Sequence, residues 1–579
     1  MLPNNFHPLP SETDTVRPAA GSSGANSSVF LFLIKNFAVK FIYVVFKDER
    51  GFMENRNIEY LKKLNALSRD AATDYQQKAG KLPSDLLESL LHSLNAQQVY
   101  WLGILSYYDD FTMPFWTSLS SLTRKKEKVR ETTLLETLHD YIELYKFNMQ
   151  IVQKSFGPSV SGLPDFHKNQ AEKFMEGFII FPFSIDGKNV KDVSKSNAQI
   201  LNNLTKAFPQ AVLDIKKEFG FHFDDGGYLK LAETDRFSLY QVFSRNKNVW
   251  VRPEVKPIMI VHPYVLGANI LGFLPAEKKS YARAFADKGI PTYIRILKNI
   301  EENPALQVMT GEDDTRDMKY FCEIVSRRHK KMITLNGFCQ GGFICVCNIL
   351  TGELDGLVDH LITCVAPIDG TRSKALVEYL RHIPLRFRDL HYASKELPNG
   401  NRVVDGKVMS WVYKLKSMEK EAPLVTFSRD LAAVKNMSAA EGSFRLNKTA
   451  AALLHWLTYD RLDLPMAITQ MSFDSYTIPV TKDGTLPVKL FGKELNFQKM
   501  KESGIKWLIC YGEDDDLVDK DTTLAALDFV EAEVSPFPKG HGAIATTWSH
   551  PDSEYALHKR FGRGYRGPVR YQLDLEKKG

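Results

Sequence analysis

Short apolar strands alternate with helices from residue 257 onwards, and this alternation constrains the fold more than any other feature of the sequence. The segments typical of buried strands are PIMIVHPY, PTYIRIL, KKMITL and LVDHLITCVAPID, and the sequence between the first three is helical in pattern. Parallel strands need long crossover connections of this kind, whereas antiparallel strands can be joined by tight hairpins. We therefore expect an α/β fold with a doubly wound, mostly parallel sheet.

The same alternation divides the chain of 579 residues, a length that suggests two to four units. Residues 251–369 and 496–579 carry the pattern and are expected to form the two parts of the sheet core. Residues 370–495 lose it and read as a helical insertion that caps the active edge of the sheet. Residues 54–250 are predicted to be a mainly helical N-terminal domain. Residues 1–53 are predicted to be disordered apart from one apolar segment.

That segment, Val29 to Phe46, is interrupted by Lys35 and Lys40. A helix that crosses a bilayer needs about 20 apolar residues with few charges, so this is a poor span. It also lacks the features of a signal peptide. We expect peripheral contact with a membrane or docking to a partner. A packed hairpin, or an over-long gene prediction with Met53 as the true start, are the alternatives.

Charge and cysteine usage narrow the class of protein. The net charge of +6 is small for this length and spread along the chain, so nucleic acid is not an expected partner. The six cysteines form no C-x-x-C pair and no zinc-ligand pattern. Sparse cysteine in a long chain favours a reducing compartment, here the cytoplasm. No metal or organic cofactor is expected.

The sharpest local motif runs from Gly337 to Gly341 (GFCQG), between a predicted strand and a predicted helix. It has the G-x-nucleophile-x-G pattern of the nucleophile elbow, with Cys339 in place of serine. Glycines flank the nucleophile because the tight turn leaves no room for side chains. A helix that starts there favours the thiolate. The alternative is a buried cysteine in a glycine-rich turn.

Two backbone groups are expected to form an oxyanion hole beside the nucleophile. One is the N–H of Gln340. The other should come from the loop after PIMIVHPY, where the N–H of Tyr264 is the candidate. His262 precedes it, and a histidine at a strand end is more often a hydrogen-bonded packing residue than a base.

An acid and then a histidine should follow the nucleophile in this fold. The strand in WLICYGEDDDLVD runs into an acidic loop, where Asp515 is favoured over Asp514 and Asp516. His541 lies in a Gly-His-Gly loop after the next apolar strand and is favoured over His550. The carboxylate-rich loop alternatively reads as solvated or as a cation site. We expect His541 to take the thiol proton and Asp515 to orient the imidazole.

At these residues the chain resembles the polyhydroxyalkanoate synthases. The resemblance covers residues 250 to 560 and the helical N-terminal region, and its points are GFCQGG, IMIVHPYVLG, LLHWLTYDRLDLPM around Trp456, and the loops of Asp515 and His541. It implies an α/β-hydrolase core that polymerises 3-hydroxyacyl-coenzyme A through acyl-Cys339, with release of coenzyme A. It also implies contact with the growing polyester, a granule surface and a homodimer.

The loops depart from this family at three places. The family has two prolines and a tryptophan where this chain has His262-Pro263-Tyr264, a histidine where it has Asp516, and Asn-Pro-Pro where it has GAIATTWSHP. The altered loops leave two alternatives open. One is a thioesterase or polyester depolymerase with the same three residues. The other is a non-catalytic, granule-associated scaffold.

Overall fold

The computed structural model describes residues 207–374, 393–406 and 448–546, apart from Asp516 and Pro538, and a few single residues elsewhere. The apolar segment Val29 to Phe46 and the alternative start at Met53 lie outside the described residues. So do the predicted N-terminal segment, most of the predicted helical domain and the middle of the predicted cap.

An eight-stranded sheet forms the centre of the described part. Its strands are β1 (Tyr228–Glu233), β2 (Phe237–Val242), β3 (Ile258–Val261), β4 (Thr292–Leu297), β5 (Ile333–Phe338), β6 (Val358–Cys364), β12 (Lys506–Gly512) and β13 (Glu533–Phe537). Their spatial order is β1-β2-β4-β3-β5-β6-β12-β13. Strand β2 is antiparallel to β1 and β4, and the remaining neighbours are parallel. This is the strand arrangement of an α/β-hydrolase, and it confirms the predicted fold class.

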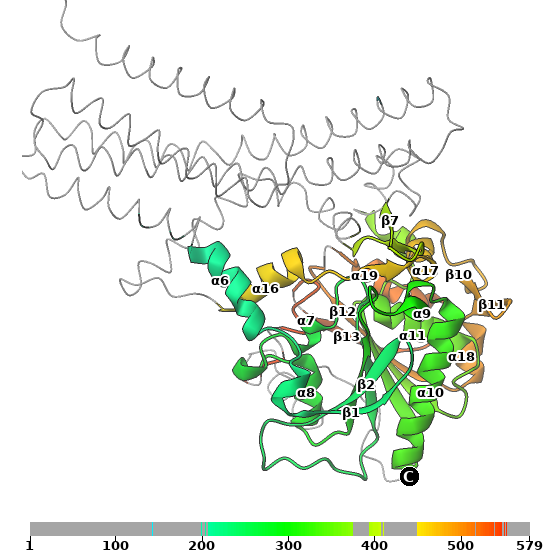
Figure 1. Cartoon of the computed structure of the whole chain (residues 1–579). Helices are drawn as coiled ribbons and strands as arrows, with labels where there is room; N and C mark the ends of the chain where they lie inside the picture. The colour runs from blue at the N-terminus through cyan, green and yellow to red at the C-terminus, as the bar shows by residue number, and fades with distance from the viewer. Residues whose placement is uncertain are drawn as a thin grey trace, which may run out of the picture. The chain divides into compact units, whose positions relative to one another are not determined.

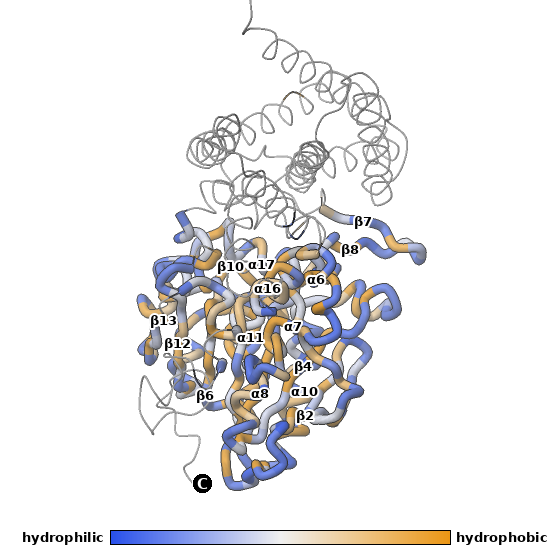
Figure 2. Tube along the Cα trace, turned by 90° about the vertical axis from the view of Figure 1, so that its left-hand side faces the viewer, coloured by the Kyte–Doolittle hydropathy of each residue, from blue (hydrophilic) through white to orange (hydrophobic). Residues whose placement is uncertain are grey.

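Helices cover both faces of this sheet. Figure 1 shows α8 (Tyr281–Ala286) on one side and α10 (Gly311–His329) and α11 (Gln340–Leu350) on the other. Further short helices are α6 (Phe208–Asp214), α7 (Asn269–Gly272), α9 (Pro304–Gln307), α18 (Gln498–Glu502) and α19 (Lys520–Thr523). The tube in Figure 2 is most hydrophobic along the inner elements. Strands β3 and β5 and helix α11 are buried throughout, as expected for parallel strands covered on both faces.

The start of α10 shows why this sequence forms a helix there. The Thr310 side chain accepts a hydrogen bond from the Asp313 N–H (3.2 Å), and the Asp313 carboxylate accepts one from the Thr310 N–H (3.1 Å). This capping box satisfies two backbone donors that the first turn leaves without partners. Acidic residues follow in the first turn and basic residues in the last, which complements the helix dipole. The capped end fixes the position of Asp314, which becomes important below.

The sheet begins earlier in the chain than predicted. Strands β1 and β2 belong to it, although both precede the expected boundary at residue 251. Strand β1 lies at the sheet edge and only partly buries its residues, so its composition did not stand out as a core strand. At the C-terminal end of the predicted, mainly helical domain of residues 54–250, an antiparallel pair of strands therefore extends the sheet.

The segment between β6 and β12 is the position of the predicted insertion. Its described elements are α16 (Lys448–Tyr459), α17 (Met466–Thr477), a three-stranded sheet of β7 (Ser394–Glu396), β8 (Arg402–Val404) and β9 (Leu464–Pro465), and a hairpin of β10 (Thr485–Leu490) and β11 (Lys493–Asn496). Figure 1 shows α16, α17 and β7 at the same end of the molecule as α9 and α19. The small strands were not predicted. Among the described helices, none is both long and apolar enough to cross a bilayer.

Candidate functional site

Cys339 joins β5 to α11 without any intervening loop. Its backbone adopts φ 53° and ψ −126°, a conformation that residues with a side chain rarely take. A Cβ on Gly337 would lie 2.4 Å from Gly342 Cα, and one on Gly341 would lie 2.5 Å from the His262 carbonyl oxygen. Both obstacles are backbone and cannot move aside. The flanking glycines are therefore required by close approach of the chain, as the motif predicted.

The surroundings of Cys339 distinguish it from the other cysteines. All six are buried, and burial raises the pKa of the thiols of Cys322, Cys345, Cys347 and Cys510, that of Cys345 to about 12. Cys339 instead sits at the N-terminus of α11 and interacts with His541. Its N–H donates to the Cys364 carbonyl (2.8 Å), which pins the elbow to the neighbouring strand β6.

Asp515 and His541 meet after β12 and β13, the two strands at the edge of the sheet. His541 Nδ1 lies 2.8 Å from Asp515 Oδ2, and both side chains are buried. The other carboxylate oxygen accepts the N–H groups of Leu517 (2.8 Å) and Val518 (2.9 Å). Because these bonds hold the carboxylate in place, its orientation and that of the imidazole are both fixed.

The imidazole of His541 also interacts with Cys339. Its ring contacts that of Phe338 edge to face, with the ring centres 5.9 Å apart. Burial lowers the pKa of His541, but the charges of Asp515 and Cys339 outweigh burial and raise it to about 10. The Cys339 sulfur and Nε2 do not meet the geometry of a formed hydrogen bond, and Nε2 has no partner among the described residues. The site therefore places a strong proton acceptor beside the thiol.

The residues that the sequence analysis ranked below Asp515 and His541 do not take part in this Asp–His pair. Asp514 is exposed, and Asp516 is outside the described residues. His550 Nδ1 accepts the N–H of Asp552 (3.0 Å) and is not joined to Asp515. Among the described residues, no group of three or more His, Cys, Asp or Glu is arranged to hold a metal ion.

The two predicted oxyanion donors come from segments that contact each other. The Gln340 side chain accepts the N–H of Val265 at 3.4 Å, a long but buried hydrogen bond. Pro263 has no backbone N–H. The N–H of Gly267 donates to the Tyr264 carbonyl oxygen (3.2 Å) and is therefore already engaged. Among the described residues, the N–H groups of Tyr264 and Gln340 have no such acceptor. Both N–H groups are therefore still candidates for the predicted oxyanion hole.

His262 is used for packing. Its Nε2 accepts the N–H of Leu297 (3.2 Å), and Nδ1 lies 2.8 Å from the Pro263 carbonyl oxygen. Burial lowers its pKa to about 4, so the ring is neutral at physiological pH. With both nitrogens engaged, this histidine is not a second base.

The structure adds residues that the sequence did not identify as part of this site. Trp456 of α16 donates from Nε1 to the Leu266 carbonyl (2.9 Å), and its ring lies 3.7 Å from the place of a Cβ on Gly542. It thus touches both the oxyanion loop, residues 262–267, and the loop of His541. Asp460, just after this helix, lies against Gly267, and burial raises the pKa of its carboxyl to about 6. Its half-buried position beside Gly267 had no local signal in the sequence.

No protein-family model and no curated protein sequence matches the chain. Solved structures that are similar include a carboxylesterase of Nitrososphaera gargenis (15% identity, 55% of this chain and 92% of that chain, TM-score 0.31). A thermophilic esterase of Thermogutta terrifontis has 12% identity (56% and 94%, TM-score 0.30). The thioesterase domain of the curacin biosynthetic pathway has 11% identity (56% and 95%, TM-score 0.30). At these TM-scores the likenesses carry no conclusion about the reaction.

Proposed function

We propose that the protein is an acyltransferase that takes 3-hydroxyacyl groups from coenzyme A onto Cys339 and passes them to the hydroxyl group of a growing polyester. The observation that supports this most directly is the strained cysteine at the start of α11, next to the buried Asp515–His541 pair. A cysteine whose proton is taken by a histidine, which a carboxylate orients in turn, is suited to covalent acyl transfer.

In the first half-reaction His541 Nε2 takes the proton from the Cys339 thiol. The thiolate attacks the thioester carbonyl, and the negative charge on oxygen is met by the N–H groups of Gln340 and Tyr264. When the tetrahedral species collapses, the carbon–sulfur bond to coenzyme A breaks. His541 returns the proton to the coenzyme A thiolate. The products of this half-reaction are free coenzyme A and an acyl-Cys339 thioester.

In the second half-reaction a hydroxyl group attacks the acyl-Cys339 carbonyl. His541 takes its proton, an ester bond forms, and the Cys339 thiolate leaves and is reprotonated. Because one thioester is exchanged for another in the first step, a cysteine nucleophile suits a coenzyme A thioester well. If water replaced the hydroxyl, the same residues would act as a thioesterase.

The test is coenzyme A release from 3-hydroxybutyryl-coenzyme A, together with analysis of the acyl product by mass spectrometry. We expect release with a growing oligomer for the wild type, and release at least 1,000-fold slower for Cys339→Ala, since residual catalysis without the nucleophile is small. A denatured, unreduced sample taken during turnover should carry an acyl group on the peptide that contains Cys339.

Cys510→Ala is the matched control, because Cys510 is a buried cysteine of β12 whose side chain interacts with Cys364 and not with Cys339, His541 or Asp515. It should retain coenzyme A release. Formation of only free 3-hydroxybutyrate would replace the synthase by a thioesterase. Equal release by wild type and Cys339→Ala would contradict covalent catalysis at Cys339. No release, with Cys339 inert to alkylation, would favour the non-catalytic scaffold.

A further inference from the structure

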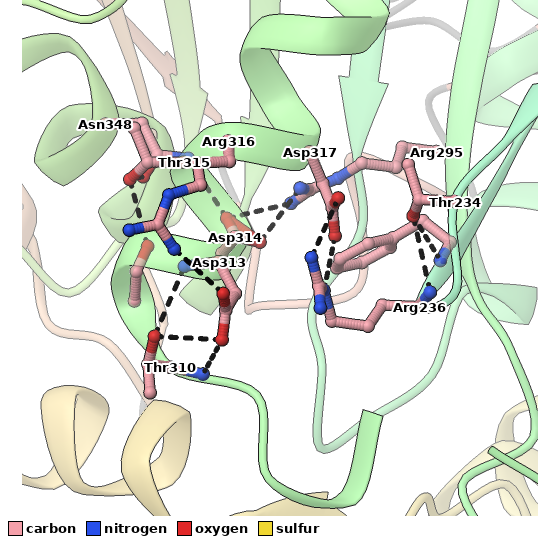
Figure 3. Close-up of polar contacts among 12 residues, drawn as sticks. Thr234, Arg236, Arg295, Thr310, Asp313, Asp314, Thr315, Arg316, Asp317 and Asn348 are labelled. Atoms are coloured by element: carbon pink, nitrogen blue, oxygen red, sulfur yellow. Dashed lines mark hydrogen bonds and ion pairs between the residues drawn. The ribbon is translucent and has the colours of Figure 1, made fainter. Parts of the chain in front are cut away.

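A buried ion pair lies behind the oxyanion loop. Arg295 of β4 and Asp314 of α10 are completely buried, with Nη1 2.8 Å from Oδ1. Figure 3 shows the two side chains directed at each other, beside the separate pair of Arg236 and Asp317. The Arg295 guanidinium also lies over the Phe237 ring, 4.1 Å from its centre. The pair therefore has a fixed geometry without access to water.

The phenol of Tyr264 completes this cluster. Its hydroxyl accepts a hydrogen bond from Arg295 Nη2 and donates one to Asp314 Oδ1, each at 2.5 Å. The Tyr264 side chain has no exposed surface. Because both the donor and the acceptor are charged and rigid, the hydroxyl has one defined position. Tyr264 is also the residue whose N–H is the loop's candidate oxyanion donor.

The cluster reaches the second oxyanion donor as well. Asn348 donates from Nδ2 to Asp314 Oδ2 (3.0 Å), and its Oδ1 accepts the Thr315 hydroxyl (2.7 Å). Asn348 belongs to α11, the helix that begins at Gln340. The same carboxylate thus holds the loop that carries Tyr264 and the helix that carries the Gln340 N–H. The Gln340 side chain adds a direct bond between the two segments.

Stability alone is a weak reason for such a cluster. Removing two charges from water is expensive, and replacement of a buried ion pair by apolar residues is often neutral or stabilising. What the pair supplies is a definite position for the groups that bind it. The N–H donors of an oxyanion hole need a definite position, because small displacements of preorganised groups strongly reduce the rate of the catalysed reaction.

We propose that Tyr264, Arg295, Asp314 and Asn348 are positioning residues that hold the two oxyanion donors in register. The inference rests on the proposed acyl transfer at Cys339. Reagents that react with Cys339 without forming an oxyanion should be indifferent to the cluster, and those that form one should depend on it.

Tyr264→Phe tests this, because it removes only the hydroxyl. We expect kcat for coenzyme A release to fall about tenfold with KM within about twofold of the wild type. A second probe is the trifluoroacetonyl thioether of coenzyme A. The Cys339 thiolate adds to its ketone carbon, and the carbonyl oxygen becomes an oxyanion. The affinity for this ketone should fall by a similar factor. The rate of Cys339 alkylation by iodoacetamide, in which the sulfur displaces iodide, should not change. Asn348→Leu should give the same pattern with a smaller loss.

Tyr293→Phe is the matched control, since its hydroxyl contacts His329 instead (2.8 Å) and all three readouts should be unaffected. Unchanged ketone affinity in Tyr264→Phe would overturn the inference. A parallel loss of iodoacetamide reactivity would overturn it too, because the site as a whole would then be disturbed. Should the wild type release no coenzyme A, the proposed function fails, but ketone binding still decides the role of the cluster.

Discussion

The charge of Asp515 should control the reactivity of Cys339. Burial lowers the pKa of His541, and the charges of Asp515 and Cys339 raise it from 6.5 to about 10. That difference corresponds to about 5 kcal/mol in favour of the protonated ring. The charge of Asp515 is the largest of the causes that raise this pKa, so we assign Asp515 more than half, about 3 kcal/mol. Asp515→Asn removes the stabilisation of the protonated ring that Asp515 supplies. The pKa of His541 should then fall, because burial favours the neutral imidazole.

The measurement is the rate of Cys339 alkylation by iodoacetamide between pH 5 and 10, with the site of labelling identified by mass spectrometry. About 3 kcal/mol is roughly a 100-fold change in the equilibrium that moves the proton from sulfur to imidazole. We expect Asp515→Asn to be alkylated about 10- to 100-fold more slowly at pH 7. Coenzyme A release should fall further, by about 10,000-fold, because the ring also loses its tautomer and orientation.

Asp514→Asn is the control, because it removes the same charge from an exposed neighbour. Its alkylation and turnover should match the wild type. Alkylation of Asp515→Asn within about threefold of the wild-type rate at pH 7 would show that the charge of Asp515 does not control Cys339. This role of Asp515 is also refuted if Asp514→Asn loses as much, since the effect would then be general electrostatics of the loop.

Three further predictions concern stability. Between pH 6.5 and about 10 the folded state holds a proton on His541 that the unfolded chain releases, so the free energy of unfolding should fall as the pH rises through this range. Between pH 6.5 and about 4 the unfolded chain binds a proton that folded His262 refuses, so stability should also fall, by up to about 3 kcal/mol, as the pH drops. Urea denaturation across pH 4 to 10 checks both, and an acid arm unaltered in His262→Gln would contradict the second. Gly341→Ala should lower the thermal midpoint or prevent folding because its Cβ meets backbone at 2.5 Å, whereas Gly542→Ala, with 3.7 Å to a ring atom, should be tolerated in the same melting experiment.

The predictable part of the site was the part with local signals. The G-x-C-x-G turn requires glycine at Gly337 and Gly341 for reasons that act within a few residues, and its place between strand and helix was visible in the alternation of the sequence. Asp515 and His541 each follow an apolar strand, and parallel strands bring their carboxyl ends to one edge of the sheet. The two residues therefore had to lie near each other, and the structure brings them to 2.8 Å.

Residues that depend on tertiary pairing gave no such signal. Arg295 stands in an apolar strand and Asp314 in the acidic first turn of a helix, where it reads as a complement to the helix dipole. Only the folded chain shows that the two charges neutralise each other in the interior. Strand β1 was missed for a related reason, because an edge strand buries too little to show a core pattern.

The buried hydrogen bonds around Cys339 and His541 have a physical reason. The segments of Cys339, Tyr264, Asp515 and His541 are distant in sequence, and buried polar contacts join them in two pairs. Gln340 binds Val265, Trp456 binds Leu266 while its ring lies beside the histidine loop, and Asp515 binds His541. Apolar packing alone would tolerate small relative shifts of these loops, because dispersion contacts have little directionality. Hydrogen bonds in a water-free interior do not tolerate them, since an unmade bond there leaves a buried group unsatisfied. The polar contacts therefore fix Gln340 against the loop of residues 262–267 and the His541 imidazole against Asp515, while the Trp456 ring is the apolar contact that reaches the loop of His541.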